Sequence, residues 1–195
     1  MNIILLSGGS GKRLWPLSND VRSKQFIKLF KNNGQYESMV QRVYRQLKEV
    51  DENSNITIAT SKTQVSVIHN QLGDNVSVSV EPCRRDTFPA IALSTAYLHY
   101  VKNVSLDDSV VVCPVDPYVE DSYFECIKDI YEYSCTGQSN LTLMGIAPSE
   151  PSEKFGYIMP KTNGQISQVD SFKEKPSENL AKEYIEKGGL WNGGV

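Results

Sequence analysis

Short apolar runs alternate with helical patterns along this chain, and this alternation limits the possible folds more than any other feature. Five runs of strand length, mostly β-branched, recur among the 195 residues. They are Ile3–Leu6, Ile56–Ala59, Val76–Val80, Val110–Cys113 and Leu141–Ile146. Such runs are typical of strands that are buried on both faces. We therefore expect a mixed, mainly parallel sheet with helices on both sides, which is a three-layer, Rossmann-like α/β fold.

Four helical patterns lie between or after these runs, over residues 37–50, 90–101, 122–131 and 177–187. Pro89 suits the first turn of the second helix. Ser122 and Glu125 have the spacing of a capping box at the start of the third helix. Ser177 is suited to cap the fourth helix. No repeat or low-complexity linker interrupts the pattern, so we expect one domain over residues 1–195.

Charge and cysteine usage exclude several classes of protein. The formal net charge is −3, whereas proteins that coat nucleic acid carry a basic excess. The four cysteines form no CxxC pair, which argues against a zinc site and favours the buried thiols of a cytosolic protein. The run Ile3–Leu6 is too short for a signal peptide or a membrane span. We expect a cytoplasmic protein that binds neither nucleic acid nor membrane.

Glycines follow the first predicted strand, in the stretch Gly8–Gly9–Ser10–Gly11. Glycine lets a ligand approach the main-chain amides, and successive amides can cradle an anion. Two known phosphate loops do not fit. A P-loop needs Gly where Leu6 stands and Ser or Thr where Arg13 stands, and the dinucleotide fingerprint needs Gly in place of Leu14. A glycine-rich turn with incidental charges is the alternative.

Arg13 and Lys24 favour phosphate binding. A guanidinium can hold a phosphate by two hydrogen bonds, and an ammonium acts as a mobile point charge. The segment Trp15–Leu17 contains Pro16, which interrupts a helix and so keeps both cations on one loop. One cation at about 4 Å contributes roughly 4 kcal/mol at an effective dielectric constant of 20. Several cations are needed for a triphosphate, and a divalent metal would help most.

The motif GGSGKRLWPLS followed by SKQF resembles the signature of the bacterial mannose-1-phosphate guanylyltransferases, which are sugar-phosphate nucleotidylyltransferases. The resemblance implies a fold of the nucleotide-diphospho-sugar transferase type and Mg²⁺ or another divalent cation as cofactor. The family usually has Pro where Ser23 stands, so we expect a looser loop that leaves Lys24 in place. The catalytic residues would include Arg13 and Lys24. The first part of the nucleotide site would comprise Leu6, Gly8, Gly9, Ser10, Gly11 and Lys12.

A second motif, EPCRRDTFPAIA, is similar to the family's EPxxRNTAPAIA. Glu81 or Asp86 can accept hydrogen bonds from guanine, and Arg85 can donate to phosphate or to a base oxygen. The resemblance places all three in the nucleotide site. The family has Asn where Asp86 stands. The alternative is a helix start that Asp86 or Thr87 caps.

The run Val110–Cys113 continues through Pro114 and Val115 to Asp116, so an apolar strand brings one carboxylate to its tip. A single Asp suits magnesium, which keeps several waters and takes few protein oxygens. The stretch resembles the family's PSDH, whose Asp holds magnesium, so Asp116 is predicted as the metal ligand and as a catalytic residue. Pro117 replaces the family's His. A turn with no function is the alternative.

Three later fragments resemble the family's sugar-phosphate site. They are GI with the following GYI, the FKEKP stretch, and WNGG in place of WNSG. Carboxylate and amide groups can bind sugar hydroxyls, and an ammonium can pair with the sugar phosphate. Packing glycines and a charged strand edge are the alternatives. The resemblance implies a site made of Gly145, Gly156, Tyr157, Glu174, Lys175 and Asn192.

The implied reaction transfers GMP from GTP to a sugar 1-phosphate, with mannose 1-phosphate as the first candidate. Heptose guanylyltransferases and uridylyl- or thymidylyltransferases are the alternatives within this class. Substitutions at Ser23, Asp86, Pro117 and Gly193 motivate a binding protein without turnover, and a hydride-transferring Rossmann protein is a third class. The family's catalytic domain continues past WNSG, so we expect the chain to lack the C-terminal part. A homodimer would be one way to cover the exposed sheet.

Overall fold

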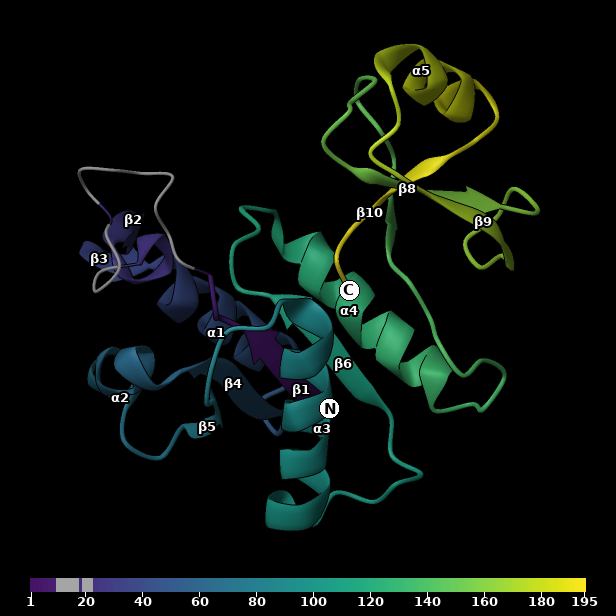
Figure 1. Cartoon of the computed structure of the whole chain (residues 1–195). Coiled ribbons are helices and arrows are strands. Elements are labelled where there is room, and N and C mark those ends of the chain that lie inside the picture. The colour runs from purple at the N-terminus through teal and green to yellow at the C-terminus, as the bar shows by residue number, and fades with distance from the viewer. Residues whose placement is uncertain (10–17, 19–22) are drawn as a thin grey trace. The chain divides into compact units, whose positions relative to one another are not determined.

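The computed structural model describes residues 1–9, 18 and 23–195. These residues form two compact units, Met1–Asn140 and Leu141–Val195, and each is described by itself (Figure 1).

The first unit is built on a four-stranded parallel sheet. Its strands are β1 (Asn2–Leu6), β4 (Asn55–Ser61), β5 (Ser77–Glu81) and β6 (Val110–Pro114), in the order β5-β4-β1-β6. Leu6 pairs with Ala59 on one side and with Pro114 on the other. Four of the five predicted strands are thereby confirmed, and their carboxyl ends lie at one edge of the sheet.

Helices cover both faces of this sheet, as predicted (Figure 1). The helices of the unit are α1 (Met39–Val50), α2 (Val65–Leu72), α3 (Thr87–Lys102) and α4 (Asp121–Ser134). The chain moves outward from β1 to β4 to β5 and then returns to β6 beyond β1. Because parallel crossovers are right-handed, this reversal puts α3 on the face opposite to α1 and α2. Helix α4 packs against α1, and α3 packs on β1, β4 and β5.

The core lies on both faces of β1. Ile4, Ala59 and Leu98 form a buried cluster on the α3 face. Ile3 and Leu5 alternate with Ile4 along the strand, so they point to the other face, and neither is exposed. Burying one such side chain stabilises the fold by about 1.5–3 kcal/mol. The register of β1 is therefore strongly fixed.

A hairpin of β2 (Lys28–Asn32) and β3 (Gln35–Ser38) precedes α1. Its turn residues Asn33 and Gly34 have φ values of 47° and 84°. Two successive positive φ values are what a two-residue hairpin turn requires, and Asn-Gly is its strongest sequence signal. This hairpin was not predicted.

The second unit contains a small antiparallel sheet and one helix. Its elements are β7 (Gly145–Ile146), β8 (Gly156–Pro160), β9 (Val169–Glu174), α5 (Glu178–Glu186) and β10 (Leu190–Asn192). The strand order is β7-β10-β8-β9. The predicted strand over Leu141–Ile146 is wrong except at its last two residues.

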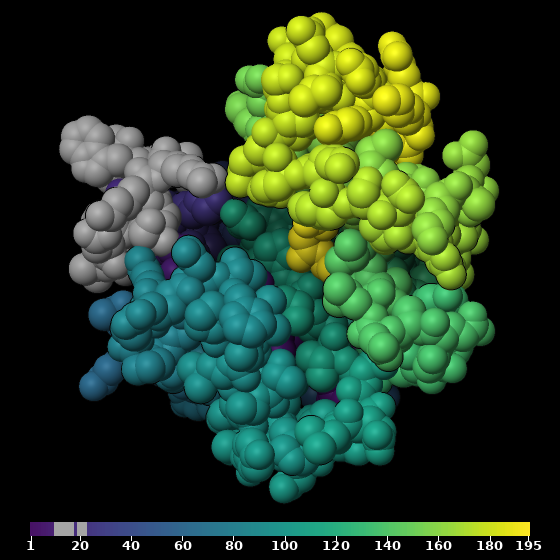
Figure 2. Space-filling model, turned by 45° about the vertical axis from the view of Figure 1, so that its right-hand side comes forward, coloured from purple at the N-terminus to yellow at the C-terminus, as the bar shows by residue number. Residues whose placement is uncertain are grey.

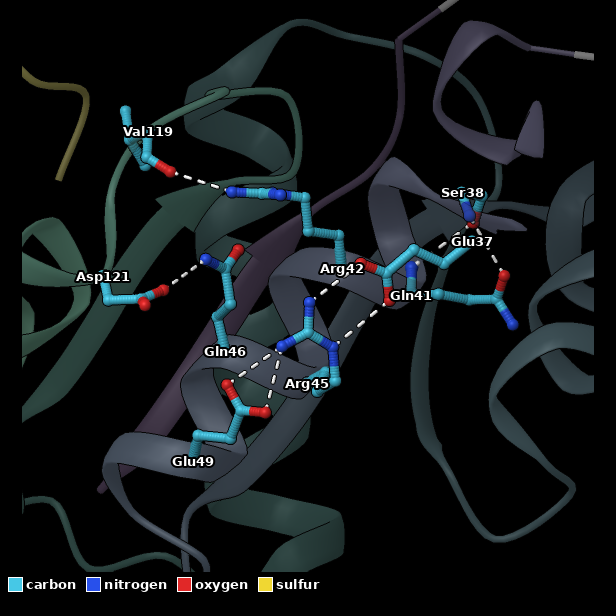
Figure 3. Close-up of polar contacts among 9 residues, drawn as sticks. All are labelled: Glu37, Ser38, Gln41, Arg42, Arg45, Gln46, Glu49, Val119 and Asp121. Atoms are coloured by element: carbon cyan, nitrogen blue, oxygen red, sulfur yellow. Dashed lines mark hydrogen bonds and ion pairs between the residues drawn. The ribbon is translucent and has the colours of Figure 1, made fainter. Parts of the chain in front are cut away.

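Helix starts differ in part from the predictions. The capping box lies at the start of α1, where the Gln41 amide N–H donates to the Ser38 hydroxyl and the Gln41 side chain accepts from the Ser38 amide (Figure 3). The box predicted at Ser122 is wrong, because α4 begins at Asp121 and Glu120 is its N-cap. Helix α3 begins at Thr87, ahead of the predicted start. Ser177 is the N-cap of α5, as predicted.

Apolar side chains also reach the surface of the first unit. Helix α3 exposes Phe88, Tyr100 and Val101, and Figure 2 shows this part of the chain in teal at the front surface. Among the described residues, no helix combines the length and the apolar character needed to cross a membrane.

Substitutions of Ser38 and Ser122 test which of these two serines caps a helix. We expect Ser38→Ala to lower the free energy of unfolding by about 1–2 kcal/mol, because the hydroxyl caps α1 and also donates to Gln71. Ser122→Ala is the control and should change stability by less than about 0.5 kcal/mol. Urea denaturation measures both, and equal losses would contradict the assignment.

Candidate functional site

The carboxyl ends of β1 and β6 meet at the edge where Gly8, Gly9 and Asp116 lie. Pairing continues beyond both strands, since the Ser7 amide donates to the Ala59 carbonyl at 2.8 Å and the Val115 amide donates to the Leu6 carbonyl at 3.1 Å. These bonds fix the main chain immediately before Gly8 and Asp116. Ligands of open α/β sheets bind at this edge.

Lys24 and Asp116 come together at the edge although they are 92 positions apart in the sequence. The Lys24 Nζ lies 2.7 Å from Asp116 Oδ2, with the two side chains 28% and 47% exposed. An ion pair this exposed contributes at most about 1 kcal/mol. It can therefore open when a phosphate competes for the ammonium or a cation competes for the carboxylate.

Helix α1 holds the loop that carries Asp116. The Arg42 guanidinium donates to the Val119 carbonyl at 3.0 Å (Figure 3) and lies 4.7 Å from the centre of the Tyr118 ring. Tyr118 also stacks on Phe30 of the hairpin, with 5.4 Å between ring centres. The loop is thus fastened two and three residues beyond the carboxylate.

Helix α1 also has a link to the start of α4. The Gln46 amide donates to Asp121 Oδ1 at 2.8 Å (Figure 3). Neither Arg42 nor Gln46 appeared among the predicted site residues. Both are polar residues of α1, and the periodic pattern of that helix predicts only which apolar side chains face the core.

Ser23 stands where the family usually has Pro, and most of the loop expected to loosen, residues 10–17 and 19–22, lies outside the described residues. Ser23 itself is fully buried, and its hydroxyl accepts a hydrogen bond of 2.7 Å from Gln64. On the other side of Lys24, the Gln25 side chain donates to the Ser7 carbonyl at 3.0 Å. The hydroxyl therefore provides an anchor at this position.

Glu81 reaches from the end of β5 to the glycine loop. A Cβ atom placed on Gly8 would lie 3.1 Å from Glu81 Oε1, so the absence of a side chain at Gly8 lets the carboxylate approach the main chain. Burial raises the pKa of Glu81, and Arg84 lowers it to a smaller extent. A buried acceptor beside the loop suits a ligand that brings N–H donors.

Asp86 and Arg85 lie in the exposed stretch before α3. Asp86 is the N-cap of α3 with φ 65° and ψ −167°, and its side chain makes no capping hydrogen bond within the described residues. The alternative in which its carboxylate caps the helix is therefore wrong. A non-glycine residue in such a conformation costs about 1–3 kcal/mol, and strain of this kind gathers at binding sites.

For the other predicted nucleotide-site residues, the contacts described above give no evidence of a role in binding. Leu6 packs its side chain against the core cluster, so only its main chain is open to a role at the edge. Gly9 adds no close contact at its Cβ position within the described residues. Ser10, Gly11, Lys12 and Arg13 lie outside the described residues.

In the second unit, Glu174 and Lys175 form an exposed charge pair beside Gly156. The Lys175 Nζ lies 2.7 Å from Glu174 Oε1, and Gly156 pairs with Glu174 across β8 and β9. A Cβ atom on Gly156 would lie 2.7 Å from Glu174 Oε2. Lys175 has φ 44°, which is uncommon for a residue with a side chain.

Gly145 and Asn192 pair across β7 and β10. The Asn192 Oδ1 atom accepts from the Gly194 amide at 3.1 Å. A Cβ atom on Gly145 would lie 2.5 Å from Leu190 Cδ1, so packing alone accounts for glycine at 145. Tyr157 is fully buried, and its hydroxyl donates to the Ser152 carbonyl. Its side chain therefore serves the core of the unit.

Within residues 1–9, 18 and 23–195, no group of three His, Cys, Asp or Glu residues could hold a metal ion. Burial raises the pKa of the Cys113 thiol to about 12, which makes it unreactive. Cys83 and Cys135 are exposed, so the expectation of buried thiols is wrong for these two.

A model of the family described as "Nucleotidyl transferase" matches residues 2–195. The chain belongs to this family. It is 31% identical over 206 residues to a mannose-1-phosphate guanylyltransferase from Escherichia coli, and the match covers 98% of this chain and 42% of that relative. It is 30% identical over 202 residues to the alginate biosynthesis protein AlgA from Pseudomonas syringae pv. tomato, and this match covers 98% of this chain and 40% of that protein. The chain thus spans about two fifths of the length of these two relatives.

A solved structure agrees with this assignment. The crystal structure of a protein named mannose-1-phosphate geranyltransferase, from Thermus thermophilus, matches with a TM-score of 0.82 at 29% identity. The match covers 99% of this chain and 55% of that one. The α/β fold with its parallel sheet is therefore of the nucleotide-diphospho-sugar transferase type, as predicted.

Glu81 gives a pH-dependent test of the site. Its raised pKa means that the folded state holds this proton more tightly than the unfolded state, whose value is near 4.5. The stability from this proton is present below that value and is lost as the pH rises through the folded pKa. We expect Glu81→Gln to exceed the wild type in free energy of unfolding at about pH 7, with the difference shrinking toward about pH 4. Urea denaturation across this range checks it.

The control for Glu81 is Glu150→Gln, at an exposed position, which should follow the wild type at every pH. A wild type that is more stable than Glu81→Gln at neutral pH would contradict the burial argument.

Gly156 tests the close approach in the second unit. An alanine there would place its Cβ 2.5 Å from Phe172 Cζ, so a neighbour must move. We expect Gly156→Ala to lower the free energy of unfolding by about 1–3 kcal/mol. Gly164→Ala is the matched control, because its nearest contact would be an ordinary 3.7 Å. Equal free energies of unfolding for both variants would contradict this prediction, because they would show that Phe172 can move at little cost.

Proposed function

We propose that this member of the nucleotidyl transferase family takes part in the transfer of GMP from GTP to mannose 1-phosphate, giving GDP-mannose and pyrophosphate. The names of the relatives support the substrates, since a mannose-1-phosphate guanylyltransferase is 31% identical over nearly the whole chain. The chemistry of the sheet edge supports the reaction class.

One observation carries the proposal. A mobile ammonium, Lys24, and an exposed carboxylate, Asp116, lie 2.7 Å apart at the carboxyl edge of the sheet, next to the strand end that leads into Gly8. Such an edge offers main-chain amides and a cation to phosphates, and a single carboxylate to a divalent cation. Arg13, by its place in the sequence, would add a second cation.

The reaction forms a bond between a sugar-phosphate oxygen and the α-phosphorus of GTP. It breaks the bond from that phosphorus to the oxygen that bridges the α- and β-phosphates, and this oxygen leaves with pyrophosphate. The attacking oxygen is already an anion near neutral pH, so no general base is needed. Catalysis then depends on position and on charge neutralisation. The amides of Gly8 and Gly9 would hold the leaving phosphates, and Lys24 would offset the charge that develops on them.

Asp116 fits a divalent cation as its one protein carboxylate, because magnesium in such sites keeps waters and takes phosphate oxygens. The ion would neutralise phosphate charge when bound. On binding, Asp116 would exchange its contact with Lys24 for the ion, and this would leave the ammonium available to the phosphates.

Base and sugar would be read by different groups. Glu81, buried and beside Gly8, would accept from the N1–H and amino groups of guanine, and Arg85 and Asp86 would approach the nucleotide from the exposed start of α3. Glu174 and Asn192 would accept from sugar hydroxyls, and Lys175 would pair with the sugar phosphate. The cytoplasmic location and the homodimer stay predictions.

Substitutions of Lys24 and Lys175 test whether GTP and mannose 1-phosphate are bound by different lysines. We expect Lys24→Met to weaken GTP binding in the presence of Mg²⁺ about tenfold while changing mannose 1-phosphate binding little, and Lys175→Met to do the reverse. Arg13→Ala should behave like Lys24→Met. Isothermal titration calorimetry measures each affinity, and Lys182→Met, at an exposed lysine of α5, is the control.

Equal losses for both ligands in both variants would contradict the assignment of roles. Pyrophosphate release from GTP and mannose 1-phosphate tests turnover. Tight GTP binding without release would favour the alternative of a nucleotide-binding protein, and a preference for UTP or dTTP would overturn the guanine assignment.

A further inference from the structure

Gln64 is a buried polar residue that the proposed chemistry does not use. It ends the short helix η3 (Lys62–Gln64), just before α2. Its side chain has no exposed surface, so its amide group depends on partners within the protein.

Three partners surround the Gln64 amide. The Thr60 hydroxyl donates to Oε1 at 2.7 Å, and Nε2 donates to the Ser23 hydroxyl at 2.7 Å and to the Gly9 carbonyl at 3.5 Å. The contact with the Gly9 carbonyl is long for a hydrogen bond, and a carbonyl oxygen only accepts, so this contact agrees with the nitrogen facing Gly9. One side chain from the β4–α2 connection is thereby bound to the main chain after β1 and to the residue before Lys24.

Lys24 lies between two buried anchors. Ser23 and Gln25 are 0% and 2% exposed, and the Gln25 side chain is bound to the Ser7 carbonyl. The main chain at Lys24 is therefore held through Ser23 by Gln64 and through Gln25 by the end of β1, while its ammonium extends to Asp116.

We propose that Gln64 is a positioning residue that sets the distance between the amides of Gly8 and Gly9 and the ammonium of Lys24. The ligand class that needs this spacing is a linear polyphosphate, either a nucleoside triphosphate or inorganic pyrophosphate, because its charges are spread along a chain. This consequence rests on the proposed function. Gln64 contacts no phosphate and acts through Gly9 and Ser23, and a misplacement of about 1 Å is enough to weaken such a site strongly.

The first test compares Gln64→Leu with Gln41→Leu by calorimetry. Gln41 also loses two side-chain hydrogen bonds, to the Ser38 amide and to the Gln71 carbonyl, so it controls for lost stability. We expect Gln64→Leu to weaken Mg²⁺–GTP and Mg²⁺–pyrophosphate each about tenfold and to leave mannose 1-phosphate within about twofold. Gln41→Leu should leave all three within about twofold.

The second test needs no ligand. The amides of Phe26 and Ile27 donate to the carbonyls of Ser23 and Lys24, so their hydrogen exchange reports how firmly this segment is held. We expect exchange at both amides to rise about tenfold in Gln64→Leu. In Gln41→Leu it should rise by less than about twofold, because Gln41 reaches this segment only through Gln71, whose side chain donates to the Phe26 carbonyl. Unchanged exchange in Gln64→Leu would overturn the positioning role.

The tests separate this inference from the proposed function. A wild type that binds neither GTP nor pyrophosphate would refute the function, while faster exchange in Gln64→Leu would still support the anchor. If Gln64→Leu does not fold, Ser23→Ala removes one partner of the amide and should raise the same exchange rates about threefold. Polyphosphate affinity that survives both substitutions would overturn the proposal.

Discussion

The pairing of β1 with β4 on one side and β6 on the other is the constraint on which the site depends. Ile3, Ile4 and Leu5 have no exposed surface, so a slip of one residue would move the polar Asn2 or Ser7 into a position that an apolar side chain fills. The register carries through to the carboxyl edge, where Ser7 and Val115 continue the ladder. The positions of Gly8 and Asp116 relative to one another are thus set by the hydrophobic core.

The edge combines weakly held charges with a firmly held main chain. The ion pair of Lys24 and Asp116 is exposed and is easily exchanged for a ligand. The glutamine contacts behind it are buried and bind carbonyl and hydroxyl groups that ligands do not reach. Such a division suits phosphate chemistry, in which charges must move to new partners while the amides that position the phosphates stay in place.

The second unit uses a different device. Its antiparallel sheet brings Gly156 opposite Glu174, and the missing side chain at Gly156 lets Phe172 and Glu174 approach the main chain. The exposed pair of Glu174 and Lys175 presents an acceptor and a cation together, which are the two groups that a sugar phosphate requires. Tyr157, one strand position away from Gly156, belongs instead to the interior.

The parallel strands, most of the helices and the carboxylate at the tip of β6 were predictable from the sequence, because strand length and apolar alternation are local properties. Ser38 and Ser122 have the same capping spacing, and only the folded chain decides that Ser38 starts a helix. The contacts of Gln64 with Ser23 and of Lys24 with Asp116 span 41 and 92 positions. Pairs so distant leave no periodic signal, so their partners were decided only when the sheet brought them to one edge.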